Sequence, residues 1–193
     1  SKKGIAVINC PHMSGRSVAE LVISHVISLA RTIPIHTINC NKGNWQKTSA
    51  NSFEIRGKKL GIIGYGNVGS QLSTLAEALG MKVYYYDINC VMSLGNSIKC
   101  DTLDELLGIS DFLTLHVPET PKTINMIQNE QIKKMRKGAY LLNLSRGSIV
   151  NLNHVRDNIL SKYLAGGAFD VFPCEPKKNG EKWSCVLQNL DNV

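Results

Sequence analysis

Between residues 57 and 172, short apolar runs alternate with longer stretches in which apolar side chains recur at helical spacing. The apolar runs predict strands at 60–64, 82–87, 111–117, 139–145 and 165–171, with a weaker strand at 97–100. The stretches between them predict helices at 67–79, 102–107, 130–135 and 153–163. Because these strands are apolar throughout, we expect them to be buried on both faces. The pattern therefore predicts an α/β fold, a doubly wound parallel sheet with helices on both sides.

Residues 1–56 show a different pattern. The run GIAVI at 4–8 predicts a further strand, and residues 16–33 predict a helix. The main apolar stripe of that helix consists of Ala19, Val22, Val26, Leu29 and Ile33. Ile23 and Ile27 lie outside the stripe and are also apolar, so we expect burial on two sides, between two domains or two subunits. Residues 34–56 are polar and irregular, which predicts a loop.

The 193 residues carry 22 basic and 15 acidic side chains, a net charge of +7. This charge favours anionic ligands, dinucleotides among them. The basic residues are scattered as pairs, with no stripe of basic and aromatic side chains, so no nucleic-acid partner is expected.

Six cysteines occur singly, without a C-x-x-C pair or paired histidines, so we predict no metal site. The most apolar stretch, from Val18 to Ile33, contains Glu20, His25 and Arg31 and is too short and too charged to span a bilayer. No signal-peptide pattern opens the sequence. These features predict a cytoplasmic protein with reduced thiols and no membrane partner.

The segment GYGNVG at 64–69 lies where a predicted strand ends and a helix begins. In that setting each glycine has a physical function. Gly64 permits a tight turn, Gly66 lets the backbone approach a pyrophosphate, and Gly69 lets the helix pack closely on the strand. The N–H groups of the helix N-terminus would then face the phosphates. The segment predicts a dinucleotide site.

Asp87 ends the next strand, 18 residues beyond Gly69, where a carboxylate would accept hydrogen bonds from the adenosine ribose hydroxyls. A 2′-phosphate at that place would be repelled by about 4 kcal/mol, if two unit charges lie about 4 Å apart at an effective dielectric near 20. The following residues INCV contain no arginine that could reverse this preference. We therefore predict NAD, rather than NADP, as the cofactor.

Further polar residues follow strands later in the chain, at the carboxyl ends where ligands of open parallel sheets bind. LHVP at 115–118 contains His116, which on its own is more often structural than catalytic. Arg146, between Ser145 and Gly147, is suited to hold a carboxylate through two parallel hydrogen bonds.

The segment AFDVFPCEP at 168–176 places Asp170 and Glu175 on either side of a Phe-Pro turn. A carboxylate held this stiffly commonly orients a base or a substrate. The sequence then raises the question of which base Glu175 would serve.

Four segments together carry a family resemblance: GKKLGIIGYGNVGSQLSTLAEALGMKVYYYD, SDFLTLHVPETPKT, LLNLSRGSIV and FDVFPCEP. In this order and spacing they resemble the D-isomer-specific 2-hydroxyacid dehydrogenases, and most closely the members that act on 3-phosphoglycerate. CPHMSGRSVAELVISHVISLAR is similar to the family's domain-linking helix and the segment before it. The resemblance covers nearly the whole chain.

The resemblance implies hydride transfer from a 2-hydroxy acid to NAD. It implies that Arg146 holds the substrate's carboxylate and hydroxyl oxygens, and that Glu175 hydrogen-bonds a catalytic histidine and raises its pKa. It implies a cofactor-binding set, by backbone or side chain, of Gly64, Gly66, Asn67, Val68, Gly69, Asp87, His116, Val117, Pro118, Thr123, Ser145 and Asp170.

The resemblance also implies an organisation. The catalytic histidine of the family lies in a Pro-His-x-Gly segment that follows a stretch like LQNLDNV, and no histidine here lies beyond residue 154. We therefore expect one NAD-binding domain over 1–193 that turns over little substrate by itself, the substrate domain being absent. Its expected parts are an edge strand and lead-in segment at 1–15, a linking helix at 16–33, a core at 57–172 and a return segment at 173–193. The helix is expected to form a homodimer interface, within a dimer or a tetramer.

Two alternatives stay open at this point. Hydroxypyruvate or glyoxylate reductases and D-lactate dehydrogenases resemble this sequence at the same site residues. A non-catalytic, NADH-sensing interaction protein would keep the fold, but it would need neither Arg146 nor Glu175.

Overall fold

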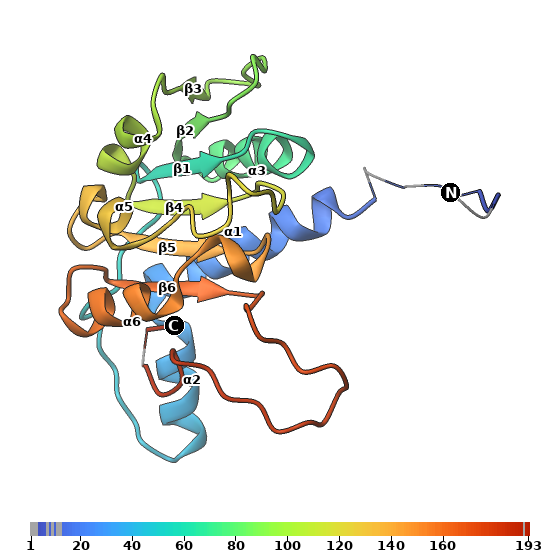
Figure 1. Cartoon of the computed structure of the whole chain (residues 1–193). Coiled ribbons are helices and arrows are strands. Elements are labelled where there is room, and N and C mark those ends of the chain that lie inside the picture. Colours follow the sequence, from blue (N-terminus) through green and yellow to red (C-terminus); the bar gives the residue numbers. More distant parts are fainter. Residues whose placement is uncertain (1–3, 7, 9, 11–12, 191) are drawn as a thin grey trace.

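The computed structural model describes residues 4–6, 8, 10, 13–190 and 192–193. Its centre is a sheet of six parallel strands in the order β3-β2-β1-β4-β5-β6 (Figure 1). In chain order the strands are β1 (Lys59–Ile63), β2 (Lys82–Tyr86), β3 (Ile98–Lys99), β4 (Phe112–Leu115), β5 (Tyr140–Asn143) and β6 (Gly166–Phe169). The chain runs outward from β1 to β3 and then returns to pair β4 with the free side of β1. This order confirms the predicted doubly wound parallel sheet.

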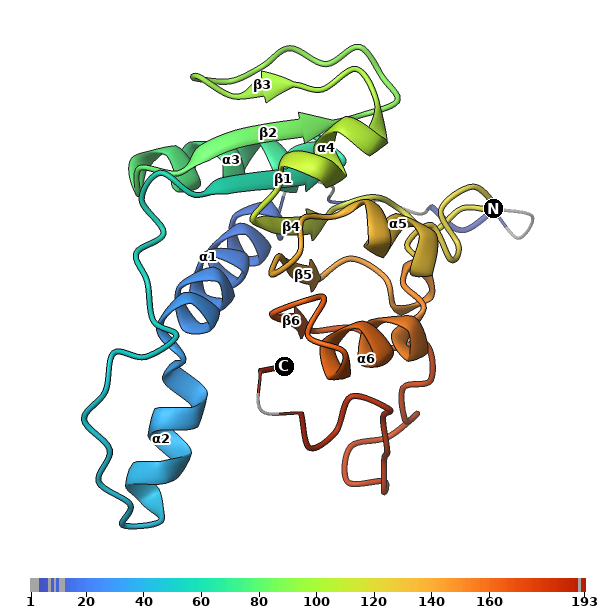
Figure 2. The same cartoon turned by 90° about the vertical axis from the view of Figure 1, so that its left-hand side faces the viewer.

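Helices cover both faces of the sheet (Figure 2). One face carries α1 (Gly15–Arg31) and α3 (Asn67–Ala78), and the other carries α4 (Leu103–Ile109), α5 (Asn129–Lys134) and α6 (Leu152–Leu160). Neighbouring residues of β1 point to opposite faces of the sheet and pack in different hydrophobic clusters. Ile62 packs in the cluster with Val22 and Leu72. Ile63 packs in the cluster with Leu106 and Ile132. This two-sided burial explains why the strands read as apolar throughout.

The helices α3 to α6 have bounds within three residues of those predicted, whereas every strand except β1 is shorter than predicted. Residues 116–117, 144–145 and 170–171, predicted as strand, lie beyond the ends of β4, β5 and β6. They turn into the loops that follow the sheet. The predicted candidate residues His116, Ser145 and Asp170 therefore stand just past the strand ends.

The predicted helix over 16–33 is confirmed as α1, which ends at Arg31 because Thr32 adopts a left-handed conformation with φ of 51°. The prediction of a loop over 34–56 is wrong in its first part: α2 (Ile33–Asn41) follows at once, with Pro34 in its first turn. None of its residues is buried, so no apolar stripe marked it in the sequence. Among the described residues no single helix is long and apolar enough to cross a membrane, and only α1 with α2, bent by 69°, pass that test together.

The strand predicted at 4–8 falls partly outside the described residues, which omit Val7. Gly4, Ile5, Ala6 and Ile8 form no strand. Ile5 and Ile8 are 64% and 87% exposed, so neither of these two side chains belongs to the core.

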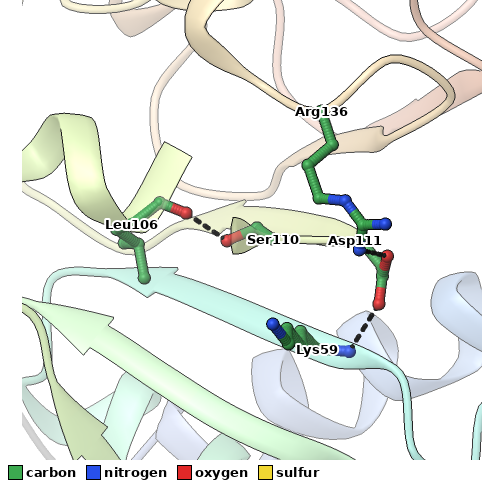
Figure 3. A network of polar contacts seen from close by, with 5 residues as sticks. All are labelled: Lys59, Leu106, Ser110, Asp111 and Arg136. Atoms are coloured by element: carbon green, nitrogen blue, oxygen red, sulfur yellow. Dashed lines mark hydrogen bonds and ion pairs between the residues drawn. The ribbon is translucent and has the colours of Figure 1, made fainter. Parts of the chain in front are cut away.

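Asp111 connects the amino-terminal ends of β1, β4 and β5 as a clamp; Figure 3 shows its contacts with Lys59 and Arg136. Its carboxylate accepts a hydrogen bond from the Lys59 N–H at 2.8 Å and forms an ion pair with Arg136. Its own N–H donates to the Lys59 carbonyl, and its carbonyl accepts from the Tyr140 N–H, both at 2.9 Å. This clamp lies at the edge of the sheet opposite the glycine segment, so its contribution is to stability.

We predict that Asp111→Ala lowers the free energy of unfolding by about 1–3 kcal/mol, because the half-buried Lys59 N–H and the Arg136 guanidinium lose their acceptor. The matched control is Asp104→Ala, which removes an exposed ion pair with Lys134 and should cost about 0–1 kcal/mol. Urea unfolding of both variants measures the difference. Equal losses would contradict the clamp.

Candidate functional site

The glycine segment makes its turn at the point where the strand order reverses. Gly64 follows β1 with φ of +92°, and a Cβ on it would lie 2.6 Å from the carbonyl oxygen of His116, which follows β4. The His116 N–H donates to the Ile63 carbonyl at 2.7 Å, so the two chain segments stay paired up to this contact. Only glycine fits this conformation and this space.

Gly66 and Gly69 differ in the space around them, as their separate predicted functions require. A Cβ on Gly66 would meet nothing within 4 Å, whereas one on Gly69 would lie 2.3 Å from the Gly64 carbonyl oxygen. Gly66 is also the N-cap of α3 and has no side chain to accept from the first-turn N–H groups. The open space over Gly66, in front of a helix N-terminus that begins with Asn67 and Val68, fits a pyrophosphate.

Asp87 lies immediately after β2, beside this turn. Its Oδ2 accepts from the Tyr65 N–H and its Oδ1 from the Asn89 N–H, both at 2.8 Å. Each carboxylate oxygen keeps a further lone pair. The carboxylate is thus fixed in place with acceptor capacity for ribose hydroxyls.

The segment after β4 forms the neighbouring wall. His116 is half-buried, its Nε2 lies 3.0 Å from Thr114 Oγ1, and burial lowers its pKa to about 4, so the ring is neutral near pH 7. Thr123 Oγ1 donates to the Pro118 carbonyl at 2.7 Å and accepts from the Thr120 N–H at 2.8 Å. Val117 stands against Gly64. His116, Val117, Pro118 and Thr123 carry no charge near pH 7, so these four residues can line a nucleotide without adding charge.

Asn143, which the sequence analysis did not single out, organises the segment after β5. Its side chain is fully buried, and its Oδ1 accepts from Ser145 N–H at 3.2 Å and Oγ at 2.9 Å. Its Nδ2 donates to the Arg146 carbonyl at 2.9 Å, and its own carbonyl accepts from the Asp170 N–H at 3.2 Å. An asparagine inside an apolar strand was the available signal, because a buried amide needs partners.

Arg146 and Glu175 meet in one pocket. The loop after β6 packs so closely on Gly147 that a Cβ there would lie 2.1 Å from the Phe172 carbonyl carbon. A pocket of about 400 Å³ results, and it is lined by Glu119, Ser145, Arg146, Gly147, Ser148, Val171, Phe172, Pro173 and Glu175.

The charged side chains of this pocket are exposed. Arg146 Nη1 donates to the Ser145 carbonyl at 2.6 Å, and Glu175 Oε1 accepts from the Phe172 N–H at 2.8 Å. Oε2 of Glu175 has no hydrogen-bond partner in the part of the chain that the structure describes. One guanidinium and one tethered carboxylate can together hold a carboxylate ligand and orient a base.

The candidate residues therefore form two groups. The glycine segment, Asp87 and the wall from His116 to Thr123 surround the end of β1, and Ser145, Arg146, Asp170 and Glu175 lie around the ends of β5 and β6. No described histidine lines the pocket of Arg146 and Glu175. Among the described residues, no three His, Cys, Asp or Glu side chains are grouped to hold a metal ion.

A larger pocket of about 500 Å³ shares Ser148, Phe172 and Pro173 with the pocket of Arg146 and Glu175. It is lined largely by residues 150–153 and 183–186 and includes neither Arg146 nor Glu175. We place the candidate chemistry in the smaller pocket because the charged side chains lie there.

The sequence profile described as "D-isomer specific 2-hydroxyacid dehydrogenase, NAD binding domain" matches residues 23–193. The chain belongs to this family, and it is an NAD-binding domain of the Rossmann type.

Its relatives include the D-3-phosphoglycerate dehydrogenase of Dictyostelium discoideum, 50% identical over 192 residues. The D-3-phosphoglycerate dehydrogenase 2 of Saccharomyces cerevisiae is 49% identical over 201 residues. Both comparisons cover 100% of this chain but only 47% and 43% of those proteins, so the chain spans less than half their length. The crystal structure of D-lactate dehydrogenase from Aquifex aeolicus, complexed with NAD and lactic acid, matches with a TM-score of 0.80 at 33% identity. That match covers 89% of this chain and 52% of the other.

We predict that Gly66→Ala raises the Kd for NADH by about tenfold or more, because the methyl group would occupy the open space over the turn. The Tm should change by no more than about 2 °C, since no protein atom is displaced. The control, Gly69→Ala, should instead lower the free energy of unfolding by about 1–3 kcal/mol. Fluorescence titration and thermal unfolding separate the two effects, and wild-type NADH affinity in Gly66→Ala would contradict this placement of the dinucleotide.

We predict a pH dependence from His116, whose pKa of about 4 in the folded protein lies below the 6.5 of an ordinary histidine. As the pH falls, the unfolded chain takes up this proton first, so stability is lost between about pH 6.5 and pH 4. At pH 5 the loss should be about 1–2 kcal/mol relative to pH 7. His116→Asn should remove that share of the pH dependence in urea unfolding, and parallel pH profiles for both proteins would show the assignment to be wrong.

Proposed function

We propose that this chain is the NAD-binding domain of a D-3-phosphoglycerate dehydrogenase, which oxidises 3-phosphoglycerate to 3-phosphohydroxypyruvate at the start of serine synthesis. The observation that carries the proposal is the 48–50% identity, over the whole of this chain, to proteins of that name from bacteria, yeast and Dictyostelium. Because the chain spans less than half of those relatives, the substrate and the activity of the whole protein belong to the proposal.

NAD, when bound, supplies the acceptor for the hydride that leaves C2 of the substrate. In this proposal the pyrophosphate lies over Gly66 at the start of α3, with Gly64, Asn67, Val68 and Gly69 forming the turn around it. Asp87 accepts from the adenosine ribose, and Asp170 binds the nicotinamide carboxamide. The adenosine side is lined by His116, Val117, Pro118 and Thr123, and Ser145 borders the cofactor near Arg146.

Arg146 and Glu175 would serve the substrate. The exposed guanidinium of Arg146 would hold the carboxylate and hydroxyl oxygens of a 2-hydroxy acid in the 400 Å³ pocket. Glu175, tethered through Oε1, would use Oε2 to orient a histidine and to stabilise its protonated form as it takes the hydroxyl proton. A missing general base costs about 10²- to 10⁴-fold, so we propose that the chain alone binds NAD(H) and oxidises very little substrate.

Two further proposals concern the cellular location and the oligomeric state of the protein. We propose a cytoplasmic location, supported by six cysteines that are all free. We also propose that the chain forms a homodimer through the helix predicted at 16–33, as a dimer or as part of a tetramer at full length. Two apolar side chains of this segment are exposed, Leu21 by 37% and Ile33 by 44%. Sedimentation at micromolar concentration tests the dimer, and a monomer would contradict it.

The test of function uses the protein made by the whole gene. NAD reduction is measured with 3-phosphoglycerate, D-glycerate and D-lactate, and NADH oxidation with hydroxypyruvate and glyoxylate. We expect the highest kcat/KM of the three oxidations with 3-phosphoglycerate. Arg146→Lys should lower it about 10- to 100-fold through the loss of a bidentate charged hydrogen bond. Arg156→Lys, an exposed arginine on α6, is the control and should leave it unchanged.

A higher kcat/KM with another acid would assign the protein to a different member of the family. NADH binding without any dehydrogenase activity would contradict the enzyme and favour an NADH-sensing interaction protein.

A further inference from the structure

The loop of residues 87–97, which joins β2 to β3 and begins with Asp87, has little burial of its own. Ile88 and Met92 are 84% and 89% exposed. A segment with so few core contacts opens easily unless other groups restrain it. The restraints come from polar side chains of the turn, of α3 and of β2.

Tyr65, the second residue of the glycine segment, supplies the central restraint. It is 3% exposed, and its ring stacks on Tyr85 with the centroids 3.8 Å apart. Its hydroxyl lies 2.6 Å from Ser73 Oγ of α3 and 2.7 Å from Ser97 Oγ, and it accepts from the Leu94 N–H at 3.2 Å. A phenol has one proton and two lone pairs, so these three partners saturate the hydroxyl.

The same residue also contacts the first residue of the loop. The Tyr65 N–H donates to Asp87 Oδ2 at 2.8 Å. One residue of the turn thus holds the loop at both ends, through its backbone at Asp87 and through its hydroxyl at Leu94 and Ser97. The geometry of the turn and the position of the carboxylate are therefore coupled.

Two further side chains restrain the middle of the loop. The Tyr85 hydroxyl donates to the Val91 carbonyl at 3.1 Å and lies 2.9 Å from Ser93 Oγ. The Glu77 carboxylate of α3 accepts from the Asn96 N–H at 3.0 Å and 3.1 Å. Tyr85 belongs to β2 and Glu77 to α3, so neither side chain connects the loop to the glycine turn. Tyr65 lies in the turn itself and makes that connection.

We propose that Tyr65 is a positioning residue for the cofactor. Its buried hydroxyl fixes the 87–97 loop against the glycine turn, so that Asp87 and the turn are presented in one arrangement to the adenosine half of the dinucleotide. The hydroxyl is saturated by protein partners, so it acts through Asp87 and the loop and not by contact with the ligand. This inference rests on the proposed placement of the adenosine ribose at Asp87.

The test compares Tyr65→Phe with Tyr84→Phe in the 193-residue chain. Both remove one phenol hydroxyl, but that of Tyr84, on β2, has no hydrogen-bond partner among the described residues. Dissociation constants are measured for NADH, for AMP as the adenosine half and for reduced nicotinamide mononucleotide as the other half. We expect Tyr65→Phe to raise the dissociation constants of NADH and AMP by the same factor, about threefold to tenfold, as for the loss of one or two hydrogen bonds. The mononucleotide affinity should not change, and Tyr84→Phe should bind all three ligands like the wild type.

The outcomes separate a positioning role from a merely structural one. An equal loss for all three ligands, or unchanged NADH and AMP affinities in Tyr65→Phe, would overturn the inference. If wild-type chain does not bind NADH at all, the proposed cofactor site fails as well. Ser97→Ala removes the loop hydroxyl that contacts the Tyr65 hydroxyl, and it should raise the dissociation constants of NADH and AMP about twofold while leaving that of the mononucleotide unchanged. This variant keeps the inference testable if Tyr65→Phe does not fold.

Discussion

The contact between Gly64 and the His116 carbonyl is the constraint on which the rest of the site depends. β1 and β4 are parallel neighbours, and the chain leaves them in different directions, because the first continues into α3 and the second into the loop of Pro118 to Thr123. The two exits can lie this close only if one has no side chain and a positive φ. That requirement places the α3 N-terminus at the point of strand reversal, where a parallel sheet offers a crevice.

The second half of the site depends on a buried amide and not on a glycine. Asn143 connects Ser145, Arg146 and Asp170 through its side chain and backbone, so the loops after β5 and β6 are held to one strand end. Gly147 then allows the loop at Phe172 to approach, which brings Glu175 into the pocket with Arg146. The opposite edge of the sheet carries the Asp111 clamp. The residues that stabilise one end of the strands are thus different from the candidate ligand-binding residues at the other end.

The strands, the helices α3 to α6 and the glycine turn could be predicted because their signals are local: apolar periodicity, and glycines at fixed spacing. The helix α2 could not, because an exposed helix without an apolar stripe leaves no periodic signal. The functions of Asn143 and Tyr65 also escaped prediction. The hydrogen bonds of Asn143 to Ser145, Arg146 and Asp170 can be recognised only once the strand ends are placed in three dimensions. Tyr65 hydrogen-bonds Asp87 and Ser97, which lie 22 and 32 positions away in the sequence. Arg146 and Glu175 were predicted from their types and the family resemblance, and the pocket that joins them is visible only in three dimensions.

The most direct test of this account is the ratio of the dissociation constants of NADPH and NADH for the 193-residue chain. If the fixed Asp87 carboxylate faces the adenosine ribose, NADPH should bind at least about tenfold more weakly, even if solvent screens most of the repulsion of about 4 kcal/mol between close unit charges. Asp87→Ala should bring the ratio toward one. Equal affinities in the wild type would contradict the placement of the dinucleotide on which the whole account rests.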